Sequence, residues 1–180
     1  MTVLSTNYFE LFGLTPTFSV DKKELDSAYR QLQQTSHPDR FVNQPTEFQR
    51  RAVQQTAYNT EAYQALKSPV LRACHLMSLA GSDFSLTSYT VSDIDLLMQQ
   101  MEYREQLSDI KEQGDFNNFT HFVDKIDGLT ADTIGKITIL FEQGIDNSSA
   151  DLKNHICELQ FLNKLAIDLD EVEEHLLLEQ

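Results

Sequence analysis

Hydrophobic residues recur at helical spacing through most of the chain, and no stretch alternates in the way that predicts a β-strand. Within residues 21–36, Leu25, Tyr29 and Leu32 fall on one face of a helix, and Asp21 is suited to cap its first turn. The same reasoning predicts the other helices of the N-terminal part of the chain, which cover residues 7–14, 45–66 and 70–79.

Three longer helices are predicted in the remainder of the chain. Their limits are Ser92 or Asp93 to Ile110, residues 116–145, and Ser148 or Ser149 to near the C-terminus. Long helices joined by short turns predict an antiparallel three-helix bundle. The predicted fold class is therefore all-α, in two units whose boundary lies between about residues 68 and 90.

The composition limits where such a protein can work. Hydrophobic residues make up 41% of the chain, yet no apolar run approaches the ~20 residues that span a membrane. The N-terminal segment lacks the basic and apolar regions of a secretory signal. Cys74 and Cys157 are the two cysteines and are far apart, which excludes a disulfide framework and a cysteine-only metal site within one chain. We therefore expect a cytoplasmic protein without a membrane partner.

The net charge of −14 is concentrated in the second part of the chain. Residues 1–70 carry seven Lys/Arg and seven Asp/Glu, whereas residues 71–180 carry seven and 21. An acidic body argues against nucleic acid as a partner, because that binding depends on Lys and Arg at the phosphates. The excess serves either solubility alone or the docking of a basic partner.

A stiff turn is predicted between the helices of residues 21–36 and 45–66, at His37-Pro38-Asp39. Pro38 fixes its own φ and keeps His37 out of the α region, so the preceding helix must end there. Asp39 is a turn former whose carboxylate can bond nearby backbone N–H groups. Both titratable side chains are thus presented at an exposed corner between two helices.

No catalytic or metal site is predicted. General acid–base work by His37 and Asp39 would need a substrate pocket, but the residues around them are turn and surface types. The chain has no Gly-rich phosphate loop and no nucleophile motif. We expect neither cofactor nor metal, because the other histidines lack a His or Cys partner at ligand spacing; these are His75, His121, His155 and His175. For His37-Pro38-Asp39, two alternatives remain: a catalytic pair formed by His37 and Asp39, or a turn with a purely structural role.

The elements at the start of the chain are Asn7-Tyr8-Phe9-Glu10-Leu11-Phe12-Gly13-Leu14, the capped helix, the turn and the second long helix. The order of these elements resembles the J-domain family of co-chaperones. The resemblance covers residues 7 to about 70. It implies that the tripeptide is needed to stimulate ATP hydrolysis by a DnaK-type chaperone. The implied chaperone-binding residues are His37, Pro38, Asp39, Lys22, Lys23, Arg30 and Arg40.

Motifs along the rest of the chain are similar to the HscB family of iron–sulfur co-chaperones. They include Ser68-Pro69-Val70-Leu71-Arg72-Ala73, Leu97-Met98-Gln99-Gln100-Met101-Glu102-Tyr103-Arg104-Glu105-Gln106-Leu107 and Gln160-Phe161-Leu162-Asn163-Lys164-Leu165. The absence of an N-terminal cysteine cluster points to the bacterial form. The resemblance implies a J-domain at residues 1–75, a connector at 76–90 and a scaffold-binding three-helix bundle at 91–180.

The same resemblance implies two protein partners: an IscU-like scaffold, bound by the bundle, and an HscA-like chaperone that receives it. The implied scaffold-binding residues are Leu97, Met98, Met101, Glu102, Glu105, Asp109 and Phe161. Helical spacing is compatible with an apolar patch that has an acidic edge, but periodicity alone also fits Leu97 and Met101 as ordinary bundle core.

We expect a monomeric adaptor without catalysis of its own, which delivers a client and triggers ATP hydrolysis on the chaperone. Two other classes remain open. A J-domain adaptor for a different client would stimulate the chaperone without binding the scaffold. An enzyme using His37 and Asp39 would act on a small molecule with no chaperone present.

Overall fold

A computed structural model of the protein describes residues 7–89 and 94–178, with only the backbone given for 146–148. All regular structure in these ranges is helical, which confirms the predicted all-α class. The chain divides into two compact units, one ending at Asp83 and the other beginning at Phe84. Across the described part of the chain, no helix has both the length and the apolar character needed to cross a bilayer.

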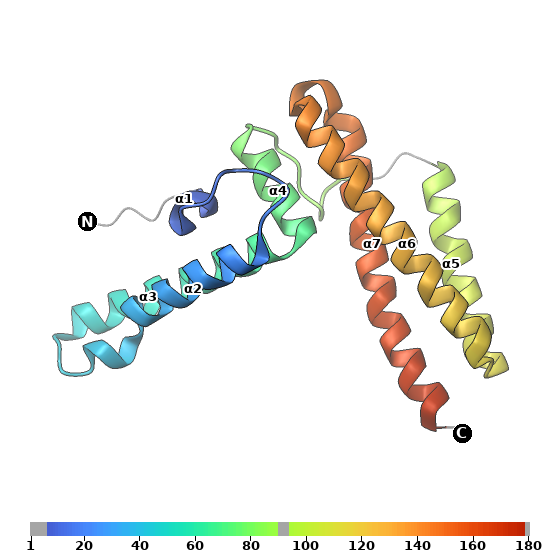
Figure 1. Ribbon diagram of the computed structural model, residues 1–180, viewed down its shortest axis with the longest axis horizontal. Helices are drawn as coiled ribbons and strands as arrows, with labels where there is room; N and C mark the ends of the chain where they lie inside the picture. Colours follow the sequence, from blue (N-terminus) through green and yellow to red (C-terminus); the bar gives the residue numbers. More distant parts are fainter. Residues whose placement is uncertain (1–6, 90–93, 179–180) are drawn as a thin grey trace. The chain divides into compact units, whose positions relative to one another are not determined.

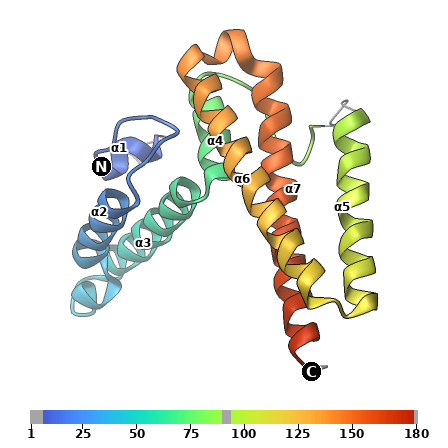
Figure 2. The ribbon, with the colours of Figure 1, turned by 45° about the vertical axis from the view of Figure 1, so that its right-hand side comes forward.

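The first unit is an antiparallel helical hairpin with smaller helices packed on it. Its elements are α1 (Tyr8–Phe12), α2 (Lys22–Ser36), a 3₁₀ helix η1 (Pro38–Phe41), α3 (Thr46–Lys67) and α4 (Pro69–Leu79). Figures 1 and 2 show α2 and α3 side by side, joined by η1 at the far end of the hairpin. The predicted helices of this part agree with these bounds to within a few residues.

The hairpin begins where the sequence predicted it to begin. The Asp21 carboxylate accepts hydrogen bonds from the backbone N–H groups of Lys23, at 2.8 Å, and Glu24, at 3.4 Å, which satisfies two free donors of the first turn. The core between the two helices is small and almost fully enclosed, since Leu25 and Leu66 are each at most 1% exposed. This packing holds α2 against α3.

Helix α4 belongs to the first unit and packs on α3, a point that the sequence left open. Ala73 and Met77 are fully buried. Arg72, only 7% exposed, donates from Nη1 to the carbonyl oxygen of Leu66 at 2.7 Å. Its guanidinium also lies 5.1 Å from the ring centre of Phe18. Arg72 therefore ties α4 to the carboxyl end of α3, where the helix dipole favours a cation.

A histidine ties α1 to α4. Nε2 of His75 accepts a hydrogen bond from the backbone N–H of Tyr8 at 3.1 Å, and the two rings stack with centres 4.3 Å apart. The Tyr8 hydroxyl donates to Glu61 at 3.0 Å, and burial together with this carboxylate raises the pKa of Tyr8 to about 12. Burial lowers the pKa of His75 below its ordinary value of 6.5. Since Nε2 must be unprotonated to accept, the contact requires a neutral ring.

The second unit is the predicted three-helix bundle. It consists of α5 (Ile94–Gln113), α6 (Phe116–Gln143) and α7 (Ile145–Leu178), and Figure 2 shows α6 and α7 running side by side. Its core is built from buried residues of all three helices: Tyr103, Leu107, Ile110, Phe119, Phe122, Ile126, Phe161, Leu162, Leu165, Leu169, Val172 and Leu176. Helix α7 packs against both α5 and α6.

Helix α7 begins earlier than the sequence predicted. Its first residue is Ile145, not Ser148 or Ser149. Gly144 alone separates it from α6 and adopts a φ of 96°, a conformation that favours glycine. No longer loop separates the two helices. The predicted caps Ser92 and Asp93 of α5 lie outside the described residues.

The neutral state of His75 predicts that the first unit loses stability in acid. The unfolded chain takes up a proton near pH 6.5, whereas the folded ring binds it only at a lower pH. The contribution of His75 to stability is thus complete above about pH 6.5 and is lost as the pH falls through the folded pKa. Urea titrations at a series of pH values, followed by amide resonances of α3, should show this loss.

The variant His75→Gln keeps an acceptor but cannot titrate, so its unfolding free energy should fall less steeply below about pH 6.5. His121→Gln, at an exposed histidine of α6, is the control and should leave the slope at its wild-type value. Equal slopes in wild type and His75→Gln would contradict the role given to this contact.

Candidate functional sites

The turn at residues 37–39, hereafter the 37–39 corner, is an exposed end of the helical hairpin. Helix α2 ends at Ser36, and His37 has φ −58° and ψ 129°, outside the α region as the following proline requires. Pro38 then opens the 3₁₀ helix η1. The side chains of His37 and Asp39 are 53% and 84% exposed, so both are available to a partner.

The two titratable side chains of the 37–39 corner contact each other. Nδ1 of His37 accepts a hydrogen bond from the backbone N–H of Asp39 at 3.3 Å and lies 3.5 Å from a carboxylate oxygen of Asp39. With Nδ1 as the acceptor, the neutral ring carries its proton on Nε2. The corner thus offers a donor on His37 and a carboxylate on Asp39 to solvent, an arrangement suited to polar docking.

The basic residues of α2 are exposed but do not share one face. Lys23 and Arg30 are seven positions apart and project from the same side, whereas Lys22 lies about a quarter turn away from them. Arg40 folds back instead, and its Nη1 donates to the carbonyl oxygen of Gln34 at 2.9 Å. Arg40 therefore also caps the carboxyl end of α2, where a positive charge complements the helix dipole.

An acidic residue of α2 is turned toward α3. The carboxylate of Asp26 accepts a hydrogen bond from the Tyr63 hydroxyl at 2.9 Å, and the Tyr63 ring stacks on Tyr29 with centres 4.1 Å apart. The Asp26 carboxylate is therefore held against α3 by this hydrogen bond.

Helix α3 contributes two side chains to the corner that the sequence analysis did not single out. The Thr56 hydroxyl donates to the carbonyl oxygen of Ser36 at 3.0 Å, and the Asn59 amide donates to the Ser36 hydroxyl at 3.1 Å. Asn59 is fully buried. A polar residue at a helical position otherwise held by Ala52, Ala62 and Leu66 is the signal that could have revealed it.

The second candidate site is an exposed apolar face of α5, hereafter the α5 patch. It comprises Ile94, Leu97, Met98 and Met101, which are 70%, 42%, 56% and 72% exposed. The buried residues of α5, Tyr103, Leu107 and Ile110, lie on the opposite side of the helix. Leu97 and Met101 are therefore surface residues, and the alternative that they belong to the bundle core is wrong. Ile94 was missed because it stands at the very start of the helix.

Acidic residues continue the α5 patch toward the carboxyl end of the helix. Glu102, Glu105 and Asp109 are all exposed. The negative charge of Glu102 also acts on the buried Tyr103: burial, and then Glu158 and Glu102, raise the pKa of its hydroxyl. One face of α5 thus joins an apolar area to a carboxylate edge, and such a face suits a partner with apolar and basic groups.

Phe161 does not share that exposed face. Its side chain is only 7% exposed and belongs to the bundle core, because α7 turns this position toward α5. The Arg104 guanidinium lies 5.5 Å from its ring centre and covers it from the α5 side. The ring is thus placed to support α5, and the structure does not present it on the surface beside Met101.

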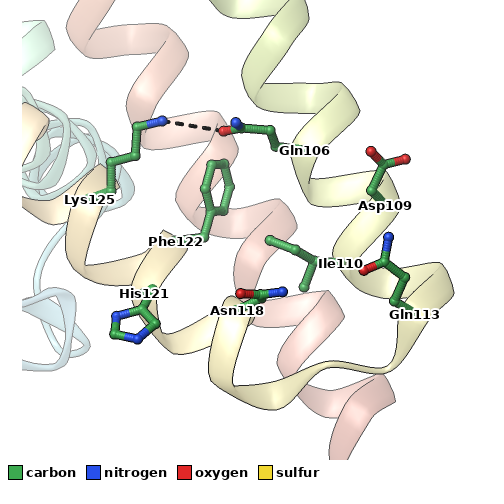
Figure 3. Close-up of a pocket in the computed structure, with 8 residues that line it drawn as sticks. All are labelled: Gln106, Asp109, Ile110, Gln113, Asn118, His121, Phe122 and Lys125. Carbon is green, nitrogen blue, oxygen red and sulfur yellow. Dashed lines mark hydrogen bonds between the residues drawn. The ribbon is translucent and has the colours of Figure 1, made fainter.

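A groove of about 340 Å³ lies between α5 and α6. Figure 3 shows Lys125 and Gln106 reaching toward each other across it, with Nζ and Oε1 3.3 Å apart. The lysine also lies 4.8 Å from the ring centre of Tyr103. The lining residues are Gln106, Asp109, Ile110, Gln113, Asn118, His121, Phe122 and Lys125. This mixture of amides and opposite charges, open to solvent, favours no reaction.

The histidines are separated from one another. His75 is bonded to Tyr8, and His155 lies 2.8 Å from a carboxylate oxygen of Glu158 on the same helix. Within residues 7–89 and 94–178, no group of three His, Cys, Asp or Glu side chains is placed to hold a metal ion.

Comparison with known proteins gives one consistent result. Residues 92–170 match a family model described as the HSCB C-terminal oligomerisation domain. The "Co-chaperone protein HscB homolog" of Shewanella pealeana is 37% identical over 172 residues, which cover 95% of this chain and 99% of the relative. That of Shewanella oneidensis is 38% identical over 174 residues, again 95% and 99% of the two chains.

Solved structures agree with this result. The chaperone HscB from Vibrio cholerae superposes with a TM-score of 0.86 at 34% identity, covering 94% of this chain and 99% of its own. The human co-chaperone protein HscB shares the fold, with a TM-score of 0.83 at 22% identity over 92% of this chain and 81% of its own. The expected monomer stays a prediction, since the family model names an oligomerisation domain.

The different placement of Phe161 and Met101 predicts different effects on stability. Phe161→Ala should lower the free energy of unfolding by about 3 to 5 kcal/mol, because it empties a core position under Arg104. Met101→Ala, at a side chain 72% exposed, should change it by no more than about 0.5 kcal/mol. Urea denaturation followed by circular dichroism measures both, and equal effects would contradict the assignment of Phe161 to the core.

Proposed function

The chain belongs to the HscB co-chaperone family, and from this premise we propose that it binds an IscU-like iron–sulfur scaffold and delivers it to an HscA-like chaperone of the DnaK type. In this proposal the bundle captures the scaffold, and the 37–39 corner docks on the ATP-bound chaperone. ATP hydrolysis takes place on the chaperone, in the cytoplasm, and supports transfer of the cluster to other proteins.

The observation that carries the proposal is the presence of two exposed, chemically different surfaces on two separate compact units. The first unit presents the 37–39 corner with Lys23 and Arg30 leading to it along α2. The second presents the α5 patch with its acidic edge. A protein that must hold a client and a chaperone at once needs two such surfaces, each built on its own core.

The chemistry of the 37–39 corner suits docking. Pro38 limits the backbone, so little conformational freedom is lost when a partner binds. The His37 ring and the Asp39 carboxylate offer one donor and one acceptor in a fixed relation. Lys22, Lys23 and Arg30 supply positive charge that speeds association with an acidic surface of the chaperone. Within this proposal the protein needs no catalytic residue, because the bond broken belongs to the nucleotide on its partner.

The chemistry of the α5 patch suits an apolar contact with a charged rim. Leu97, Met98 and Met101 supply apolar area, and methionines adapt readily to the shape of a partner. Glu102, Glu105 and Asp109 would pair with basic groups at its edge and select against an acidic partner. Phe161 would act from beneath, by supporting the helix that carries the patch. We assign residues 1–75 to the J-domain, 76–90 to the connector and 91–180 to the scaffold-binding bundle.

Replacement of His37 tests the role of the first unit. His37→Gln should abolish most of the stimulation of the chaperone ATPase in steady-state assays, because the ring that defines the corner is gone. His121→Gln, at an exposed histidine of the other unit, is the matched control and should stimulate like wild type. Equal stimulation by wild type and His37→Gln would refute the J-domain assignment.

Replacement of apolar side chains tests the role of the α5 patch. Leu97→Ala and Met101→Ala should each weaken scaffold binding roughly tenfold or more in calorimetric titrations, as expected of residues at the centre of an interface. Ile167→Ala removes a side chain that is 60% exposed on α7, outside the patch, and serves as the matched control. Unchanged affinity in all three variants, with stimulation of the ATPase intact, would indicate a different client.

A further inference from the structure

The carboxyl end of α2 has no glycine cap, and side chains bond its last carbonyl oxygens instead. Hydroxyl and guanidinium groups donate to three of its last carbonyl oxygens: Ser36 Oγ to Leu32 at 2.7 Å, Arg40 Nη1 to Gln34 at 2.9 Å, and Thr56 Oγ1 to Ser36 at 3.0 Å. The last of these donors is the only one of the three on the opposite helix of the hairpin. It therefore sets the end of α2 relative to α3.

A buried amide completes a chain of hydrogen bonds at the same point. Asn59 is fully buried, its Oδ1 accepts from Nε2 of Gln55 at 2.8 Å, and its Nδ2 donates to the Ser36 hydroxyl at 3.1 Å. The Ser36 hydroxyl in turn donates a hydrogen bond to the backbone carbonyl oxygen of Leu32. Both polar atoms of the Asn59 amide thus have a hydrogen-bond partner, and this pairing favours one orientation of the amide.

Thr56 and Asn59 are three positions apart on α3 and hold both polar groups of Ser36, the carbonyl oxygen and the hydroxyl. The carbonyl of Ser36 belongs to the peptide plane that leads into His37. Once this plane is fixed, the restriction that Pro38 places on its own φ and on the backbone of His37 leaves the Cα–Cβ bond of His37 few directions to take.

We infer that Thr56 and Asn59 are positioning residues for the 37–39 corner: through Ser36 they set the direction in which His37 and Asp39 meet the chaperone. The inference rests on the proposed function for its effect on ATP hydrolysis. Neither side chain touches the partner in this account, since Asn59 is fully buried and the Thr56 hydroxyl is bonded to Ser36.

A role of Asn59 in stability alone can be distinguished by experiment from a role in positioning the 37–39 corner. Removing one member of a buried hydrogen-bonded pair costs stability to the extent that its partner is left without a bond, and the Ser36 hydroxyl still donates to Leu32 after Asn59 is replaced. Asn59→Leu should therefore remain folded, with a melting temperature at or modestly below that of wild type. If the amide serves stability alone, this variant stimulates the chaperone normally; if it positions the corner, stimulation falls although the fold is intact.

The experiment compares three variants of the full chain. Thr56→Val and Asn59→Leu remove the two bonds to Ser36. Thr60→Val is the matched control, because it removes a hydroxyl one turn further along α3 that interacts with Tyr29 and Gln33, away from the corner. Amide hydrogen exchange of residues 39–41, melting temperature and stimulation of the chaperone ATPase are measured for each.

We expect Thr56→Val and Asn59→Leu to exchange the amides of residues 39–41 about fivefold faster than wild type, and to need about fivefold more protein for half-maximal stimulation, the equivalent of one lost hydrogen bond. Thr60→Val should change neither quantity. Wild-type exchange at residues 39–41, or wild-type stimulation, in both variants would overturn the inference. If the wild-type protein stimulates no chaperone, the proposed function fails, while the exchange rates still decide whether Thr56 and Asn59 hold the corner.

Discussion

The contact between the last residue of α2 and the middle of α3 is the constraint on which the exposed end of the hairpin depends. Pro38 forces α2 to stop, and the carbonyl groups left there must find donors. The Arg40 guanidinium and the Thr56 hydroxyl donate to two of these carbonyl oxygens, and the Asn59 amide donates to the Ser36 hydroxyl beside them. A turn that is open to solvent on its outer side is thus held from its inner side, as the proposed docking of this corner on a partner requires.

The two units carry two kinds of surface: the 37–39 corner lies on the first, and the α5 patch lies on the second. The first unit has a balanced charge and presents lysine and arginine along α2, whereas the acidic excess lies in the rest of the chain. Within the second unit, Tyr103, Leu107 and Ile110 join α5 to the core, while other apolar side chains of this helix are exposed. Each surface thus rests on packing that the other does not share.

Much of the fold could be predicted because its signals are local. The cap at Asp21, the stop at Pro38 and the amphipathic period of α2 each involve neighbours in the chain, and the structure contains all three. The prediction failed at the start of α7, where Gly144 alone separates this helix from α6. It also did not anticipate Asn59, because the partner that makes its burial tolerable is 23 positions away.

The sequence by itself determined the helical class, the order of the helices and the residues of the exposed corner, since spacing and proline geometry act over a few residues. Only the tertiary structure decided which of the apolar residues remain exposed. Met101 and Phe161 are both apolar residues of long helices, yet Met101 is exposed to solvent and Phe161 lies under Arg104. Periodicity defines the faces of a helix, but the position of the neighbouring helix determines which face is covered.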